Sequence, residues 1–187
     1  RRQRQMCIRD RLLEDHCQCE LKAASHALAL IGRNPWHEAL AQRLQRLARE
    51  ELQHYRLLRE VMARRGVEHR PPQRSPYLAG LGAANRGGEA ALLDALVVSA
   101  VVEARSCERF LALARPLAEQ DDCADLAEIY ADLARSESGH AWVFVELAKL
   151  YYPAEEVARA LEERLSVEAQ VLERIPITAR MHGGHGA

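Results

Sequence analysis

Lysine is almost absent from this sequence, since Lys22 and Lys149 are the only two lysines among 26 basic residues. Aromatic residues make up 5% of the chain, and its 187 residues include only ten glycines and seven prolines. These shortages speak against an all-β or a low-complexity protein. No apolar run reaches the ~18 residues of a transmembrane helix, because the longest, residues 95–102, stops at Glu103. The 48% hydrophobic and 28% charged residues fit a globular protein of one domain.

Paired cysteine motifs are also lacking. The five cysteines, at positions 7, 17, 19, 107 and 123, form no CxxC pair and no zinc-binding spacing. We therefore expect reduced thiols in a cytoplasmic protein. The segment Met6–Arg11 is what a transposase adaptor of a sequencing library yields on translation. We expect residues 1–11 to be a non-native segment and residues 12–187 to form a single domain.

Helical periodicity dominates the rest of the chain and predicts five long helices. Asn34 and Pro35 provide a helix cap and a first helical residue, and Gly66 provides a helix end. The expected helices span residues 12–31, 35–65, 89–114, 122–151 and 153–174. An irregular crossover, residues 67–88, separates two pairs of helices. This order predicts an all-α, ferritin-like four-helix bundle with one long crossover and an additional C-terminal helix.

Four glutamates lie on helix faces that are otherwise apolar. Around Glu103, for example, the positions one and two turns away are Leu96, Ser99, Ala100, Cys107 and Phe110. A buried carboxylate without a partner would cost several kcal/mol or become protonated. The same pattern surrounds the other three, so each of the first four long helices carries one buried glutamate: Glu20, Glu51, Glu103 and Glu137.

Two of these glutamates are followed three residues later by a histidine on the same helical face, His54 and His140. The two halves of the chain repeat one order, a glutamate and then ExxH, at separations of 31 and 34 residues. A single ExxH motif often lies on a solvated face, but the joint pattern is typical of di-metal carboxylate sites in ferritin-like bundles. Two divalent ions would neutralise the four carboxylates, and carboxylate with imidazole suits iron or manganese better than zinc. For His16, one turn before Glu20, a core histidine is the simpler interpretation.

Four sequence strings resemble those of the tRNA 2-methylthio-N6-isopentenyladenosine hydroxylases. They are residues 16–25 (HCQCELKAAS), 48–55 (AREELQHY), 102–110 (VEARSCERF) and 136–140 (SESGH). The string EARSCERF is the most specific of these, because ferritins and ribonucleotide reductases lack it. The resemblance covers about residues 12–180. It departs at Gly139, where a larger residue is expected.

The resemblance implies a non-haem di-iron monooxygenase that hydroxylates the isopentenyl group of a modified adenosine beside the tRNA anticodon. It implies two iron ions as cofactor, O2 as co-substrate and an electron donor that the sequence does not identify. By analogy with related sites, Glu51 and Glu137 would bridge the metals, while Glu20 and Glu103 would bind terminally. Carried over by motif, the catalytic metal ligands are Glu20, Glu51, His54, Glu103, Glu137 and His140.

The near-zero net charge of −1 conceals an uneven distribution. Residues 43–74 contain nine arginines and four glutamates, whereas residues 119–173 contain fourteen acidic and four basic residues. Arginine suits bidentate phosphate contacts and stacking on bases, so the basic part is a candidate tRNA surface. Pairing with acidic neighbours on a solvated helix explains it equally well. The candidate tRNA contacts are Arg64, Arg65, Arg70 and Arg74.

Two other classes of function stay open at this point. A ferritin-like ferroxidase or peroxidase would share the buried carboxylates, although ferritins usually lack the second ExxH motif. A metal-free helical module that binds tRNA would share the arginines. Iron content after anaerobic loading separates the metal-free module from the other two.

Overall fold

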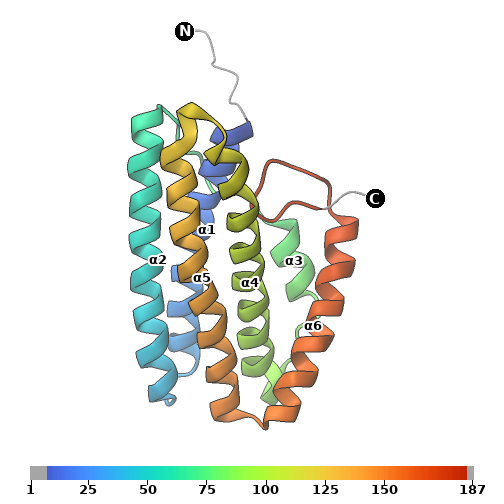
Figure 1. The fold of residues 1–187 in the computed structure, drawn as a ribbon. Helices are drawn as coiled ribbons and strands as arrows, with labels where there is room; N and C mark the ends of the chain where they lie inside the picture. Colours follow the sequence, from blue (N-terminus) through green and yellow to red (C-terminus); the bar gives the residue numbers. More distant parts are fainter. Residues whose placement is uncertain (1–7, 185–187) are drawn as a thin grey trace. The chain divides into compact units, whose positions relative to one another are not determined.

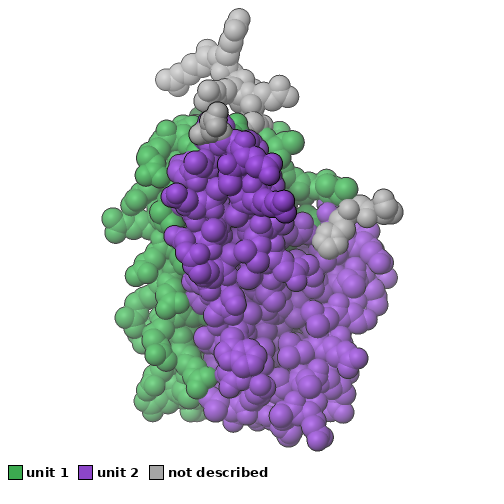
Figure 2. All heavy atoms as spheres, in the orientation of Figure 1, with its two compact units in different colours: residues 1–74, 177–183 green, residues 75–176, 184–187 purple. Residues whose placement is uncertain are grey.

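The computed structural model describes residues 8–184, which form helices and irregular segments with no β-strand among them. Two compact units are distinguished, residues 1–74 with 177–183 and residues 75–176 with 184–187 (Figure 2). Both are helical, as the sequence predicts. The division of the chain into a non-native segment 1–11 and a single domain 12–187 stays a prediction. Residues 1–7 lie outside the described part, and residues 8–11 belong to the first helix.

The first unit is a hairpin of two long antiparallel helices, α1 (Ile8–Arg33) and α2 (Glu38–Arg65) (Figure 1). Apolar side chains at helical spacing on α2 are fully buried, including Leu40, Leu44 and Leu58. Gly66 ends α2 in the left-handed conformation at φ 67°, and its N–H bonds to the carbonyl of Ala63. Glycine adopts this conformation without the strain that a Cβ would add.

The start of α2 differs from the prediction. Asn34 and Pro35 lie in the turn after α1 and do not open the next helix, which begins at Glu38. The backbone N–H of Asn34 bonds to Ile31 O at 3.1 Å, and its side-chain amide donates to Leu30 O at 2.9 Å. Asn34 therefore satisfies carbonyls at the end of α1, which is a role that the Asn-Pro pair does not reveal locally.

The second unit contains a longer antiparallel hairpin, α4 (Ala91–Ala118) and α5 (Ala124–Tyr151), and α6 (Ala154–Arg174), which packs against α4 (Figure 1). Short 3₁₀ turns, η1 (Gly88–Ala90) and η2 (Asp121–Cys123), precede α4 and α5. Helix α4 continues past the expected stop and includes Pro116 in its last turn. A proline there removes one backbone hydrogen bond near the helix end, where the disruption is small.

The crossover between the hairpins contains a helix that the sequence analysis leaves out, α3 (Pro76–Gly82). Ser75 caps it by accepting from the N–H of Leu78, and Pro76 occupies its first turn. Its buried residues Tyr77 and Leu81 pack with Leu172 of α6. This apolar contact stabilises a seven-residue helix that would be marginal in isolation.

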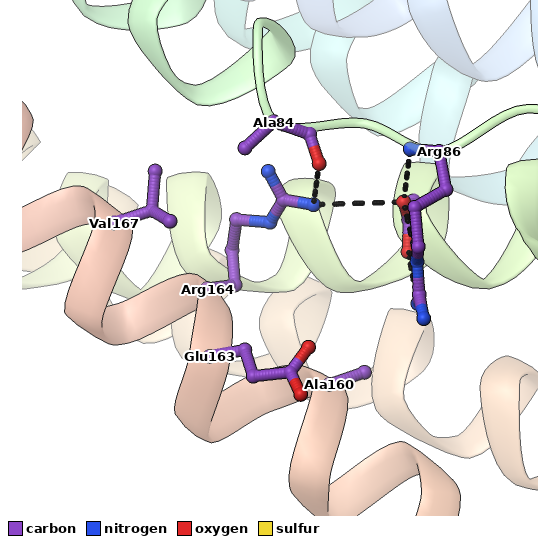
Figure 3. A pocket seen from close by; sticks show the side chains of 7 residues that line it. Ala84, Arg86, Ala160, Glu163, Arg164 and Val167 are labelled. Atoms are coloured by element: carbon purple, nitrogen blue, oxygen red, sulfur yellow. Dashed lines mark hydrogen bonds and ion pairs between the residues drawn. The ribbon is translucent and has the colours of Figure 1, made fainter.

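Arg164 of α6 bonds to the carbonyl of Ala84 in the turn that follows α3 (Figure 3) and to the last turn of α3 itself. Its buried guanidinium donates at 2.6 Å to the carbonyl of Leu81, which the last helical turn leaves free, and at 3.4 Å to the carbonyl of Ala84 just after the helix. It also lies 3.7 Å from Asp94, whose carboxylate binds Arg86 through two nitrogens and accepts the Arg86 backbone N–H. These contacts fix the irregular residues 83–87 against α4 and α6.

Candidate metal centre and family

In the first unit, three predicted ligands lie together on α1 and α2. Glu20 and Glu51 are buried, and His54 is mostly covered. The Nδ1 atom of His54 lies 3.4 Å from a Glu20 oxygen and 3.7 Å from a Glu51 oxygen. One ligand atom from each residue falls within 4.8 Å of the others. Two carboxylates and one imidazole at this separation match the donor set that iron uses in carboxylate sites.

His16 adds a contact that the sequence analysis does not assign to the site. Its fully buried ring donates from Nε2 to a Glu20 oxygen at 2.5 Å. Burial by itself would raise the pKa of Glu20, but the contacts with His16 and His54 outweigh it and hold the pKa low, at about 2. Burial would lower the pKa of His54, and the two adjacent carboxylates raise it instead, to about 10. His16 therefore fixes the ionised form and the orientation of Glu20.

In the second unit, the other three predicted ligands lie together on α4 and α5. Glu103, Glu137 and His140 are all buried, and one ligand atom from each lies within 4.8 Å of the others. The Nδ1 atom of His140 is 3.5 Å from a Glu137 oxygen. The ExxH spacing places both side chains on one face of α5, as expected from helix geometry.

Small side chains accompany this second cluster. Ser99 and Ala100, one turn before Glu103, are buried, and the hydroxyl of Ser99 bonds to the carbonyl of Ala95 at 2.8 Å. Cys107, one turn after Glu103, donates to the carbonyl of Ala134 at 3.2 Å, and burial raises its thiol pKa. Thiols of raised pKa are poor nucleophiles and poor metal ligands, so Cys107 acts here as a small packing residue. Gly139, between the two α5 ligands, faces open space.

The candidate tRNA contacts have mixed surroundings. Arg64 is exposed in the last turn of α2, and Arg70 and Arg74 are exposed on the irregular segment that follows. Arg65 is half-buried and interacts with other groups of the protein.

A family model described as tRNA-(MS[2]IO[6]A)-hydroxylase (MiaE) matches residues 2–183. The chain belongs to this family. The MiaE relatives with assigned names include a tRNA 2-(methylsulfanyl)-N(6)-isopentenyladenosine(37) hydroxylase of Pseudomonas putida, which is 40% identical over 174 residues. The match covers 92% of this chain and 82% of the relative. A protein of the same name from Salmonella typhimurium is 31% identical, with 92% of this chain and 80% of that protein covered.

A solved structure also resembles this MiaE family member along almost its whole length. It is described as protein 43 with aldehyde deformylating oxygenase activity from Synechococcus. The TM-score is 0.86 at 33% identity, and the match covers 94% of this chain and 88% of the other. The likeness confirms the ferritin-like, all-α fold class that the helix order predicts.

Two further residues of the EARSCERF string take part in an interaction that the sequence analysis missed. Arg105 binds Glu168 of α6 with two nitrogens, at 2.9 and 3.0 Å, and also pairs with Glu108. The hydroxyl of Tyr77 donates to the same Glu168 carboxylate at 2.5 Å. Burial and the neighbouring carboxylate raise the pKa of Tyr77, which keeps it protonated as a donor. The string thus connects α4, α6 and the crossover helix α3.

Proposed function

We propose that this protein is an O2-dependent di-iron monooxygenase that hydroxylates the isopentenyl group of 2-methylthio-N6-isopentenyladenosine in tRNA. Membership of the MiaE family over residues 2–183 and two relatives named for this hydroxylation support the substrate and the reaction. The observation that carries the chemistry is the cluster of two glutamates and one histidine on each helical hairpin. Helical RNA-binding modules have no need for such buried carboxylates, because burial without a counter-charge is costly.

The donor set fits iron. Each hairpin provides two buried carboxylates and one imidazole, and neither cluster contains a thiolate. Four carboxylates balance two divalent ions, which makes the buried site neutral when both metals are bound. We propose that six residues are the ligands of the two irons: Glu20, Glu51, His54, Glu103, Glu137 and His140.

When bound, a pair of ferrous ions supplies an oxidant made from O2 and two electrons, which is strong enough to break an allylic C–H bond. The protein holds the ligands in place and excludes water. His16 keeps the Glu20 carboxylate ionised and oriented through its 2.5 Å hydrogen bond. On α4, the buried residues one turn before Glu103, Ser99 and Ala100, have small side chains, and we propose that O2 and the prenyl group approach the metals on this side.

The finer partners follow from the same proposal. Prenylated tRNA is the substrate, the electron donor is a partner that the sequence does not identify, and the cytoplasm is the location. No described helix has the length and apolar character that crossing a membrane requires. Arg64, Arg65, Arg70 and Arg74 are proposed to contact the tRNA backbone.

The experiment that tests the function is a reaction with defined substrate. Protein loaded with ferrous iron without oxygen is mixed with isopentenylated tRNA, a chemical reductant and O2, and the digested nucleosides are measured by mass spectrometry. We expect the modified adenosine to gain one oxygen atom, and Glu137→Ala to abolish the gain. Bound iron with no oxygen incorporation would contradict the hydroxylase assignment, and failure to bind iron would favour the metal-free module.

A further inference from the structure

The irregular segment between α2 and α3, residues 67–75, is hydrogen-bonded to side chains of α1. Glu14 accepts the backbone N–H of Arg70 at 2.8 Å, and Gln18 donates to the carbonyl of the same residue at 2.9 Å. One turn further on, Lys22 donates to the carbonyl of Gln73 at 3.0 Å. Since these three residues are spaced by four, they form one stripe on α1 that faces the segment.

The C-terminal segment, residues 177–183, also forms hydrogen bonds with residues 67–75. Arg180 donates to the carbonyl of Arg74 at 2.9 Å and pairs with the side-chain oxygen of Gln73. Asp15 of α1 accepts the backbone N–H of Met181 at 2.9 Å, and Met181 is buried. Residues 70–74 are therefore bound by α1 and by residues 177–183, all within the first unit.

Of the five hydrogen bonds named above that reach residues 70–74, four use the backbone and one uses the side chain of Gln73. None of them uses an arginine side chain of this segment. The side chains of Arg70 and Arg74 are exposed as a result. Residues 64–74 contain four arginines and one acid, Glu68. Arg180 and Lys22 add two further positive charges at the edge of the segment. Pro71 and Pro72 restrict the backbone between the two exposed arginines.

An ordinary basic loop must be ordered when it binds, and this lowers its affinity. Here the ordering is already accomplished by folding, and two guanidinium groups, on residues four positions apart in the sequence, are presented to solvent. Guanidinium groups bind phosphate oxygens with two parallel hydrogen bonds. A surface of this kind suits a polyanion with regularly spaced phosphates.

We propose that residues 67–75, held by the α1 stripe and by Arg180, form a preorganised surface that binds the phosphate backbone of the substrate RNA. Arg70 and Arg74 make the contacts, while Glu14, Gln18 and Arg180 are positioning residues. The choice of RNA over another polyanion rests on the proposed function.

The test measures binding of a labelled anticodon stem–loop RNA to the full chain by fluorescence anisotropy over a range of salt concentrations. Losing two phosphate contacts reduces the slope of log affinity against log salt by about 2. We expect Arg70→Ala with Arg74→Ala to bind about tenfold more weakly at ~0.1 M salt and to show this smaller slope. The matched control is Arg159→Ala with Arg174→Ala, an equal charge change at exposed positions of α6, outside the basic residues 43–74. Equal binding by both double variants would overturn the proposal.

A neutral variant tests the positioning role separately. Gln18→Leu removes the hydrogen bond to the backbone carbonyl of Arg70 without changing the charge. We expect weaker RNA binding with an unchanged salt slope, and faster amide hydrogen exchange in residues 70–74. Unchanged affinity together with faster exchange would contradict preorganisation. Thermal melting identifies a variant that is merely unfolded, and Gln18→Met, which is also neutral and cannot donate to the carbonyl, serves as the second variant.

The outcomes also separate this proposal from the hydroxylase assignment. If the wild type hydroxylates tRNA and the Arg70/Arg74 variant keeps the same KM, the surface is wrong and the function stands. If RNA binding depends on the two arginines while no hydroxylation occurs, the surface stands and the function is wrong. Binding to phosphatidylserine vesicles that depends on Arg70 and Arg74, with RNA binding unaffected, would assign the surface to a membrane and overturn the proposal.

Discussion

His16 is the residue whose role changes most between sequence and structure. From the sequence it is one more histidine on the buried face of α1, and a core position explains it. In the structure its ring donates to Glu20, one of the proposed ligands, at 2.5 Å. The signal was available, since a histidine four residues before a buried carboxylate lies on the same helical face. Spacing alone does not distinguish a packed ring from a hydrogen-bonded one.

We predict that His16→Leu weakens iron binding 10- to 100-fold, the usual effect of losing a residue that orients a metal ligand. The measurement is competition with a ferrous chelator in the absence of oxygen, together with Mössbauer spectra of the iron that remains bound. His16→Gln keeps a donor and should recover part of the affinity. Equal iron affinity and identical spectra for His16→Leu and the wild type would exclude an orienting role.

Asp94 gives a prediction about pH. Burial would raise the pKa of its carboxyl, but the bonds from Arg86 outweigh burial and lower the pKa. A carboxyl with a lowered pKa in the folded state stabilises the protein above its unfolded pKa of ~3.9, and this stabilisation is lost as the pH falls. We expect Asp94→Asn to reduce the free energy of unfolding by about 1–3 kcal/mol at pH 7. The deficit should shrink below pH ~4, as measured by urea unfolding across pH. A deficit independent of pH would assign the loss to packing.

At the scale of elements, the long helices are predictable and the crossover is not. Helix α6 starts after Pro153 and ends at Arg174, as the sequence predicts, because proline and helical periodicity are local signals. Helix α3 has local signals too, Ser75 and Pro76, but seven residues are too few for periodicity to show. Its stability comes from Leu172 and Arg164 of α6, which lie more than 80 residues away in sequence. Contacts at that separation cannot be read from a local pattern.

Two glycines of α3 offer a matched test of this packing. A Cβ on Gly80 would lie 2.8 Å from a methyl group of Val171, whereas a Cβ on Gly82 would meet nothing within 4 Å. Alanine is favoured over glycine in a helix by up to ~1 kcal/mol. We therefore expect Gly82→Ala to be neutral or stabilising and Gly80→Ala to destabilise by about 1–3 kcal/mol through overpacking. The measurement is the denaturant midpoint of unfolding of each variant relative to the wild type. Equal shifts of the same sign for the two variants would show that α3 is not packed tightly on α6.

At the scale of the whole molecule, the buried carboxylates and the family are predictable because four helices carry the same exceptional pattern. Glu20, Glu51, Glu103 and Glu137 each interrupt an apolar face, and a pattern repeated four times is unlike chance. The basic region is predicted more weakly. Its arginines can be read from the sequence. The hydrogen bonds from Gln18, Lys22 and Arg180 to the backbone of this region depend on the folded geometry and cannot be predicted from the sequence.

The division of the proposed ligands between two helical hairpins predicts a link between metal and stability. A metal that binds the folded state at 100 times its Kd adds about 2.7 kcal/mol to the free energy of unfolding. We expect anaerobic ferrous loading to raise Tm by several degrees and a chelator to reverse the change. Glu103→Ala should lose most of the increase, whereas the surface variant Arg46→Ala should keep it. A Tm that iron leaves unchanged would argue against metal binding by the folded protein.

Residues 177–183 return the chain to the first unit after α6, so the proposed RNA surface would give the C-terminal region a part in substrate capture. Removing residues 177–187 leaves every long helix intact but deletes Arg180 and the Met181 amide. A truncated or C-terminally nicked protein would then keep its helical content and its iron but bind RNA with lower affinity. Trimming by a carboxypeptidase would lower turnover at low tRNA concentration, an effect easily mistaken for damage to the metal centre.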